Sequence, residues 1–408
     1  MHNILVITYW SFKDALIQGY TLPYLKIILK YLPKKSNIHL VTLEQAHQNI
    51  SEENKEVIKS TLQKEGIIWH PYKYQKFGIG AILKWTMYIF KLSHLIKENQ
   101  IKAIHTWCTP AGAIGYILST ITGLPLILDS YEPHADLMKE THTWESNSLA
   151  YRILFWLEQK QTHRAQHIIG CVESVKYYAK SNYHFSIKDE NFHVKPACVN
   201  FKQFDLAKSK NIQLLQEFGL ENKIVCLYAG KFGDAYLYEA TFEFFAMASN
   251  FWQDDVRFLI LSDLSDTRLQ QMCELYHIDI NKFVKLFVDY REIADYIGLA
   301  DFALSPYVPV PAKRYGTPIK NGEYWAMGLP VVITPNISDD SSIIEKEQIG
   351  AVIKSFDNDA YLKAVQQIDS LLKSTNQIDL KNKIKEIAEK YRSFDIAEKV
   401  YQKIYGHL

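Results

Sequence analysis

The 408-residue chain lacks the features that mark nucleic-acid-binding, zinc-binding and disulfide-stabilised proteins. Its 46 Lys and Arg residues are balanced by 45 Asp and Glu residues, so no net field attracts nucleic acid or an anionic membrane. The five cysteines include no C-x-x-C pair, which argues against both a zinc site and a disulfide framework. We therefore expect buried free thiols at all five positions, which are Cys108, Cys171, Cys198, Cys226 and Cys273.

We also expect no targeting segment and no membrane-spanning segment. The first apolar run, Ile4–Trp10, has no cationic start or cleavage site, so we expect no signal peptide. Residues 103–128 contain no charged side chain and are long enough to span a bilayer. Because Pro110, Gly123 and Pro125 interrupt them, they predict strand, helix and strand in a buried core. We expect a cytoplasmic protein, soluble or peripheral at the inner membrane face.

Short apolar runs alternate with helical segments through both halves of the chain. Buried strands that alternate with helices predict parallel sheets covered on both faces. The sequence thus predicts an α/β protein with two doubly wound, Rossmann-like domains, whose strands end at a cleft between the domains. The predicted strands are Ile4–Tyr9, Ile38–Leu43, Ile67–Tyr72, Ala103–Trp107, Pro125–Asp129 and Ile168–Val172, then Ile224–Gly230, Arg257–Ser262, Val284–Val288, Phe302–Pro306 and Pro330–Thr334.

The most informative stretch is Thr317-Pro-Ile-Lys-Asn-Gly-Glu-Tyr-Trp-Ala-Met-Gly-Leu-Pro-Val-Val-Ile-Thr334. Lys320 and Glu323 are three residues apart, so they share one face of a helix that we expect Thr317 to cap, with Pro318 in its first turn. The free amides of a helix start, together with a lysine, suit a diphosphate. A carboxylate one turn further suits a ribose diol, so the pattern predicts a nucleotide-sugar site. A surface salt bridge on an ordinary helix is the alternative.

This stretch resembles the donor-binding motif Pro-x-Lys-x-x-Glu-Tyr-x-Ala-x-Gly-x-Pro-Val-Val of family 4 glycosyltransferases, retaining enzymes with the two-domain GT-B fold. The resemblance implies an acceptor-side domain at 1–198 and a donor-side domain at 199–392. Lys195–Phe204 is similar to the interdomain linker of the family. Residues 393–408 are similar to its last helix, which packs back on the first domain.

Two further donor positions follow from the resemblance. Gly230 and Lys231 stand where the family contacts the donor diphosphate, although a turn glycine and a solvated lysine are the alternative. A second lysine of the family is missing from Asp234-Ala235-Tyr236. Tyr315 stands where the common form has its first glutamate, which leaves recognition of the sugar open.

In the first half, ionisable side chains follow a buried strand. Glu132, His134 and Asp136 are candidates for sugar contact or for activating the acceptor hydroxyl, and a loop with helix-capping acids is the alternative. Lys13 and Gly19 lie in the loop that faces the acceptor in the family. The loop has no G-x-G-x-x-G, so an NAD fingerprint is absent.

The helix predicted at Ile79–Asn99 combines aromatic and basic side chains, including Trp85, Phe90, Lys84 and Lys91. Such a helix can dock at a membrane surface that carries a lipid-linked acceptor. A core helix with some exposed aromatic side chains is the alternative.

Together these features imply a glycosyltransferase of hexosyltransferase type, which moves a sugar from a nucleoside-diphosphate donor to a hydroxyl of a saccharide or lipid-linked acceptor. We expect retention of configuration, no metal or other cofactor, no nucleic-acid partner, and a role in surface polysaccharide or glycoconjugate synthesis. Two alternatives stay open. One is a nucleotide-sugar 2-epimerase of GT-B architecture, and the other is a non-catalytic nucleotide-sugar-binding protein, favoured by the missing glutamate and lysine.

Overall fold

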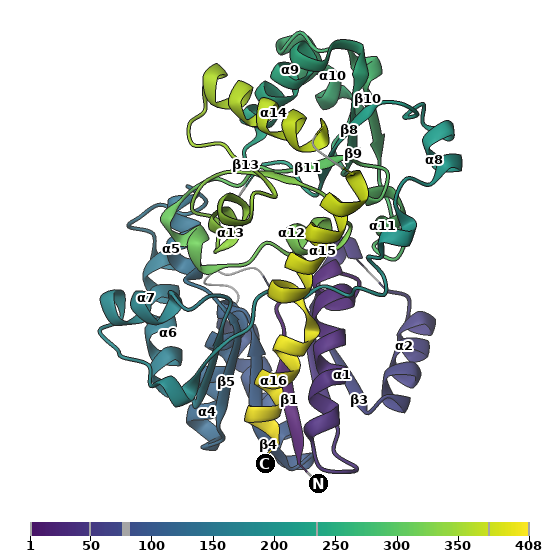
Figure 1. Cartoon of the computed structure of the whole chain (residues 1–408). Coiled ribbons are helices and arrows are strands. Elements are labelled where there is room, and N and C mark those ends of the chain that lie inside the picture. Colours follow the sequence, from purple (N-terminus) through teal and green to yellow (C-terminus); the bar gives the residue numbers. More distant parts are fainter. Residues whose placement is uncertain (1, 49, 76–81, 234–235, 374–375, 407–408) are drawn as a thin grey trace. The chain divides into compact units, whose positions relative to one another are not determined.

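The computed structural model describes residues 2–48, 50–75, 82–233, 236–373 and 376–406 (Figure 1). The chain divides into two compact units, the first Met1–Pro196 with Asp395–Leu408 and the second Ala197–Phe394. The sequence placed the domain boundaries at 198/199 and 392/393, and the structure changes unit at 196/197 and 394/395.

A parallel sheet forms the centre of the first unit. Its seven strands in the described residues run in the order β3-β2-β1-β4-β5-β6-β7. They are β1 Asn3–Ile7, β2 Ile38–Glu44, β3 Ile67–Lys73, β4 Ile101–Trp107, β5 Leu126–Tyr131, β6 His167–Gly170 and β7 Phe192–Val194. Every residue of β1 is buried, as a strand covered on both faces requires. The three-residue edge strand β7 was not predicted, because it is too short to show a pattern.

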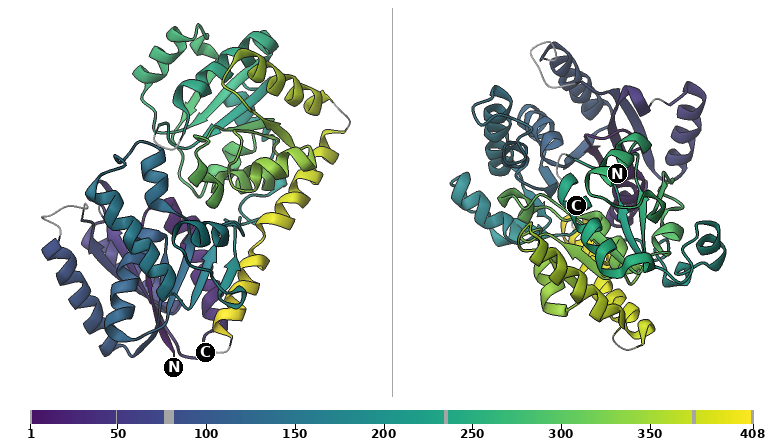
Figure 2. Two further views of the ribbon diagram at one scale, coloured as in Figure 1. Left: turned by 90° about the vertical axis from the view of Figure 1, so that its left-hand side faces the viewer. Right: turned by 90° about the horizontal axis from the view of Figure 1, so that it is seen from above.

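Helices cover both faces of this sheet (Figure 2). Alternate residues of β4 point to opposite sides, so Thr106 meets α4 while Trp107 stacks on Tyr24 of α1. Gly115 allows α4 to approach closely, since an added Cβ would lie 2.4 Å from Cγ2 of Thr106. The helices are η1 Leu16–Thr21, α1 Leu22–Tyr31, η2 Ala46–Gln48, α2 Glu52–Lys64, α3 Ile82–Glu98, α4 Thr109–Thr122, α5 His134–Glu140, α6 Leu149–Arg164, α7 Val175–Asn182, η4 Asp189–Asn191 and α16 Phe394–Tyr405.

The second unit repeats this plan with a six-stranded parallel sheet in the order β10-β9-β8-β11-β12-β13. Its strands are β8 Ile224–Ala229, β9 Val256–Leu261, β10 Phe283–Leu286, β11 Phe302–Ser305, β12 Val331–Ile333 and β13 Gly350–Val352. The sequence predicted five of these six described strands. It missed the edge strand β13, because three residues are too few to show a pattern.

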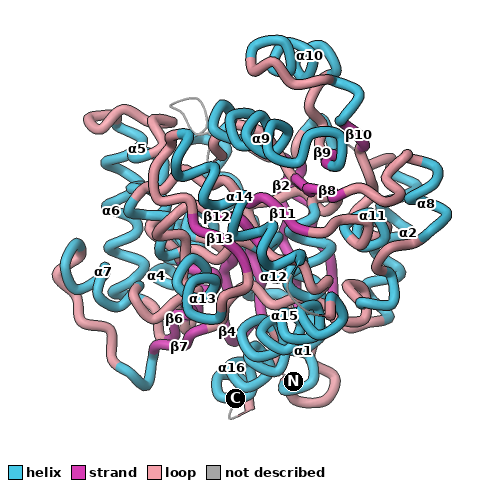
Figure 3. Tube along the Cα trace, turned by 45° about the horizontal axis from the view of Figure 1, so that its top comes forward, coloured by secondary structure: helices cyan, strands magenta, loops and turns pink. Residues whose placement is uncertain are grey.

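The helices of the second unit form two layers, which Figures 1 and 3 show on either side of its strands. Phe258 and Phe302 pack into one apolar cluster with α9 and α14, while Leu227 packs into another with α11, α12 and α15. The sheet is therefore doubly wound, as predicted. The helices are η5 Leu206–Lys208, α8 Ile212–Glu217, α9 Tyr238–Trp252, η6 Gln253–Asp255, α10 Asp266–Leu275, η7 Ile280–Lys282, α11 Ile293–Ile297, η8 Pro311–Tyr315, α12 Ile319–Ala326, α13 Asp340–Glu347, α14 Asn358–Lys373 and α15 Gln377–Arg392.

Three expectations are settled by these elements. Residues 103–128 form β4, α4 and β5, and none of the described helices is apolar and long enough to cross a bilayer. All five cysteines are free, and Cys108 alone among them is only half-buried. The helix predicted at Ile79–Asn99 is α3, but its residues 79–81 lie outside the described residues.

Both end residues of the predicted linker, Lys195–Phe204, are buried. Lys195 is fully buried in the first unit, and Phe204 is fully buried in the core of the second. The change of unit between Pro196 and Ala197 lies inside the predicted linker Lys195–Phe204. Each end of the segment is fixed by packing inside its own unit.

Lys195 belongs to a buried polar network at the carboxyl end of β5. Asp129 pairs with Nζ of Lys195 at 3.1 Å, and it accepts hydrogen bonds from Nε2 of His105 and from the hydroxyl of Tyr401, at 3.1 and 2.7 Å. Burial lowers the pKa of His105, so its neutral ring donates from Nε2 and accepts from Tyr405 at Nδ1. Because Tyr401 and Tyr405 lie on α16, this network attaches the C-terminal helix to the sheet.

Asp129→Asn should destabilise the chain, since it leaves the ammonium of Lys195 buried without its counter-charge. Loss of one partner of a buried ion pair costs about 3–5 kcal/mol of unfolding free energy, measurable by urea denaturation. Asp189→Asn is the matched control, because its side chain is 89% exposed in an ion pair with Lys176. Equal stability of the two variants would contradict a stabilising role for the Asp129 network.

Candidate donor site

The helix that carries Lys320 and Glu323, α12, begins one residue later than predicted. Pro318 is its N-cap, with a φ of −63° and a ψ of 117°, so the prediction of Thr317 as the N-cap is wrong. No side chain caps the helix, and Oγ1 of Thr317 is buried without a hydrogen-bond partner among the described residues. Since proline offers no side-chain acceptor, the amides of the first turn gain no side-chain partner from the N-cap.

The ammonium group of Lys320 is enclosed but forms no hydrogen bond with the described residues. Its Nζ lies 4.0 Å from the ring centroid of Tyr236, 5.2 Å from that of Tyr228 and 5.4 Å from that of Tyr307. Burial lowers the pKa of Lys320, while Tyr236 and Glu323 raise it in part. A desolvated cation held by aromatic faces keeps its N–H groups for an anion.

Glu323 lies one turn further along α12 and is also buried. Its Oε1 accepts a hydrogen bond of 2.9 Å from the hydroxyl of Tyr290, in the segment between β10 and α11. Burial raises the pKa of Glu323 to about 7, although the Tyr290 hydrogen bond and the charge of Lys320 oppose the rise. A surface salt bridge with Lys320, the alternative considered for this pair, is therefore not formed.

Gly230 and Lys231 follow β8 at its carboxyl end. Gly230 has a φ of +127°, and a Cβ at this position would lie 2.9 Å from Nζ of Lys320. A larger residue would thus be strained and would push Lys320 aside. The Tyr324 hydroxyl accepts from the amide of Ala229 at 3.1 Å, which fixes the end of β8 against α12. The structure therefore brings Gly230 and Lys320 together, whereas the side chain of Lys231 is exposed.

The tyrosines around Lys320 and Glu323 were not predicted. Tyr228, Tyr236, Tyr290 and Tyr307 lie on four separate segments, and no short spacing connects them. Tyr315, which replaces the first glutamate of the family, ends η8, and Asp234 and Ala235 lie outside the described residues. Lys313, in η8, places its Nζ 5.3 Å from the ring centroid of Tyr307. Its position four residues before Thr317, next to the donor-binding motif, was the sequence feature that could have identified Lys313 as a site residue.

The candidate residues of the first unit lie at the start of α5. His134 begins this helix, with its ring edge-on to Trp144, and the Glu132 carbonyl accepts from Thr109. Asp136 already accepts from Lys139, Tyr151 and Tyr178, at 2.6, 3.0 and 2.5 Å. Burial would raise its pKa, but these donors lower it. Asp136 is thus held by three hydrogen bonds, although it caps no helix.

The start of α5 depends on a carboxyl group that sequence reasoning missed. Oε1 of Glu158, on α6, accepts from the amide of Ala135 at 2.8 Å, and Oε2 accepts from the hydroxyl of Tyr183 at 2.9 Å. Burial raises the pKa of Glu158 to about 8. This contact holds His134 in place, and only the tertiary packing of α5 on α6 reveals it.

The loop after β1 differs from the prediction. Gly19 lies inside the π-helical turn η1, not in a loop, and its neighbour Tyr20 is hydrogen-bonded to Ser130 at 2.8 Å. Lys13 is exposed, ahead of that turn. The π-helical turn extends α1 backwards, so Gly19 lies in a helix and not in the predicted loop.

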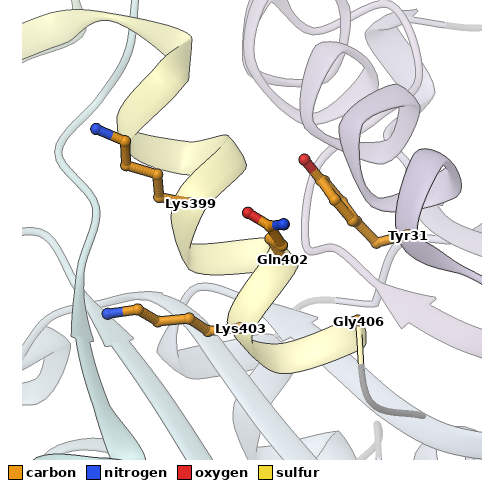
Figure 4. A pocket seen from close by; sticks show the side chains of 5 residues that line it. All are labelled: Tyr31, Lys399, Gln402, Lys403 and Gly406. Carbon is orange, nitrogen blue, oxygen red and sulfur yellow. The ribbon is translucent and has the colours of Figure 1, made fainter.

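A pocket of about 450 Å³ lies elsewhere in the first unit, between the end of α1 and α16 (Figure 4). Its lining includes none of the predicted site residues. In Figure 4 the ammonium ends of Lys399 and Lys403 point away from Tyr31, so they do not converge on a ligand within it. In the part of the chain that the structure describes, no group of three or more His, Cys, Asp or Glu residues could hold a metal ion.

Part of the second unit matches a known protein family. Residues 223–370 match the model of Glycosyl transferases group 1, and they include Gly230, Lys231, Lys320 and Glu323. No curated protein sequence matches the chain.

Solved structures resemble the whole chain. Sucrose-phosphate synthase from Thermosynechococcus elongatus has a TM-score of 0.73 at 13% identity, with 99% of this chain and 100% of that chain covered. A glycosyltransferase from Rickettsia africae has a TM-score of 0.66 at 17% identity, covering 100% and 99%. HepE from Anabaena, in complex with UDP, has a TM-score of 0.69 at 13% identity, covering 99% and 100%. The predicted GT-B fold is confirmed, and the group 1 match over residues 223–370 agrees with the resemblance to glycosyltransferases.

The raised pKa of Glu323 predicts how the stability of the chain depends on pH. In the unfolded chain this carboxyl loses its proton near its ordinary pKa of 4.5, below its folded pKa of about 7, so ionisation of Glu323 lowers wild-type stability as pH rises between these two values. Glu323→Gln removes that loss. We expect the stability of the variant relative to wild type to increase across this range and to stay constant above it.

Urea denaturation at several pH values measures this difference. Glu345→Gln is the control, because its carboxylate is half exposed in an ion pair with Lys354. A Glu323→Gln difference that does not change with pH would show that the carboxyl is not buried as described.

Proposed function

We propose that this glycosyltransferase, which has the GT-B fold and a group 1 domain at residues 223–370, transfers a sugar from a nucleoside-diphosphate donor to an acceptor hydroxyl. The donor binds the second unit at Lys320, Glu323 and Gly230, and the acceptor binds the first unit. Transfer proceeds with retention of configuration and without a metal ion, and the product belongs to a surface polysaccharide or glycoconjugate.

The observation that carries the proposal is the arrangement of Lys320 and Glu323. An enclosed ammonium group lies beside the uncapped start of α12, and a buried carboxyl group lies one turn further along. The ammonium group and the free amides at the start of α12 suit a diphosphate, and the carboxyl group suits the hydroxyls of a ribose. HepE, whose fold the chain shares, has been solved with UDP and with UDP-glucose, which supports a donor of this class.

Cationic side chains account for departure of the nucleoside diphosphate without a metal ion. As the bond to the sugar breaks, negative charge develops on the diphosphate, and a preorganised cation stabilises it. Lys320 is already desolvated, so little reorganisation is needed, and the exposed Lys231 supplies further charge at the end of β8. We assign His134 and Glu132 to the acceptor or the transferred sugar, and not Asp136, because its carboxylate is occupied.

A nucleoside diphosphate should raise the melting temperature of the chain, and a panel of UDP, GDP and ADP identifies the base. Glu323→Ala should then weaken binding by about 1.5–3 kcal/mol, through loss of a charged hydrogen bond to the ribose, measured by calorimetric titration. Lys320→Ala should weaken it as well. Binding of none of these nucleotides, or unchanged affinity in both folded variants, would contradict the proposed donor site.

The outer helices of the first unit support contact with an anionic membrane that carries the acceptor. On neighbouring helices α3, α4 and α6, Phe90, Ile121 and Trp156 are 78%, 61% and 50% exposed. These helices carry six basic residues (Lys84, Lys91, Lys97, Arg152, Lys160 and Arg164) against two acidic ones (Glu98 and the buried Glu158). Exposed apolar side chains within a cationic surface suit anionic lipid. We propose that the chain works at the cytoplasmic membrane face.

Sedimentation with lipid vesicles tests this contact. We expect the chain to bind vesicles of phosphatidylcholine and phosphatidylglycerol, less strongly at high salt, and not pure phosphatidylcholine. Phe90→Asp combined with Trp156→Asp should abolish binding. Phe287→Asp is the control, because Phe287 is 82% exposed in the second unit. Binding that survives the double substitution would contradict this surface.

A further inference from the structure

Two lysines of the second unit converge on one pair of tyrosines. Nζ of Lys320 and Nζ of Lys313 lie 5.4 and 5.3 Å from the ring centroid of Tyr307. The hydroxyls of Tyr307 and Tyr236 are 3.2 Å apart, and the two residues also pair through an isolated backbone bridge. Both ammonium groups therefore lie close to a single ring.

Aromatic rings, and not carboxylates, hold these two cations. In the described parts of the chain, neither Lys313 nor Lys320 pairs with an acidic side chain within 4.0 Å. A lysine in a salt bridge must give up its partner before it binds phosphate, whereas an ammonium over an aromatic face keeps its donors. The Tyr236–Tyr307 pair thus positions two positive charges without a carboxylate partner.

Both lysines lower the pKa of Tyr236. Burial alone would raise the pKa of Tyr236, but Lys320, the hydrogen bond with Tyr307 and Lys313 lower it below its ordinary value. Lys313 also opposes protonation of Lys320. Two like charges beside one ring favour an anion in their vicinity.

We propose that Lys313 is a second phosphate-binding cation of the donor site, acting with Lys320 on the diphosphate. The family's second lysine is missing from the segment after Gly230, where this chain has Tyr236. Lys313 approaches the same tyrosine pair from η8, so the charge is supplied from a different segment of the chain. The assignment rests on the proposed donor site, and it names a residue outside the motif shared with family 4 glycosyltransferases.

The experiment compares two adjacent cations of one turn. Lys313 is half-buried, whereas Arg314 is exposed, so Lys313→Ala and Arg314→Ala remove the same charge at neighbouring positions. Calorimetric titration uses whichever of UDP, GDP and ADP binds the wild-type chain most tightly, and the monophosphate of the same nucleoside. Melting temperatures confirm that each variant is folded.

We expect Lys313→Ala to lower affinity for the diphosphate by about 10- to 100-fold, the effect of one charged hydrogen bond. Affinity for the monophosphate should fall less, so the preference for diphosphate decreases. Lys313→Arg should keep most of the affinity, and Arg314→Ala should change it by less than about 3-fold. These results would show that Lys313 contacts phosphate through its charge.

Other results would overturn the assignment and also separate it from the donor site itself. If Lys320→Ala weakens binding while Lys313→Ala behaves like Arg314→Ala, the donor site stands and the role of Lys313 is wrong. An unchanged preference for diphosphate over monophosphate in Lys313→Ala would also exclude it. If Lys320→Ala leaves diphosphate affinity unchanged too, the proposed donor site fails.

Discussion

The second unit is built around an ammonium group that is enclosed without a hydrogen-bond partner among the described residues. Desolvation of a cation is costly, and rings of tyrosine offset only part of that cost. The cation of Lys320 is accommodated because Gly230 has no Cβ where Nζ lies, and because Tyr324 fixes the end of β8 against α12. The carboxyl of Glu323, whose pKa burial raises to about 7, lies one turn further along α12 and accepts a hydrogen bond from Tyr290.

In the first unit, by contrast, the buried lysine forms an ion pair with a buried carboxylate. At the carboxyl end of β5, Asp129 is paired with Lys195, and His105 and Tyr401 donate to the same carboxylate. These charges and donors are satisfied within the unit, so the network stabilises the attachment of α16. Near the strand ends of the first sheet the buried Lys195 is paired with Asp129, whereas Lys320 of the second unit has no acidic partner among the described residues.

The sequence predicted most of the fold, because long buried strands and helices have strong periodicity. It missed β7 and β13, which are too short to show it, and it misplaced the cap of α12 by one residue. Lys320 and Glu323 could be named because one helix turn places them on a common face. Tyr236, Tyr290 and Tyr307 could not, since only tertiary packing brings their segments to that face. Asp136 was a reasonable candidate until the structure showed its three donors.

A crystal structure of the chain with the nucleoside diphosphate it binds tests the central claim most directly. The account predicts phosphate oxygens within hydrogen-bond distance of Nζ of Lys320 and of the first amides of α12, with both ribose hydroxyls on the carboxylate of Glu323. A nucleotide bound at another place in the second unit, with Lys320 still enclosed by its tyrosines, would contradict the account.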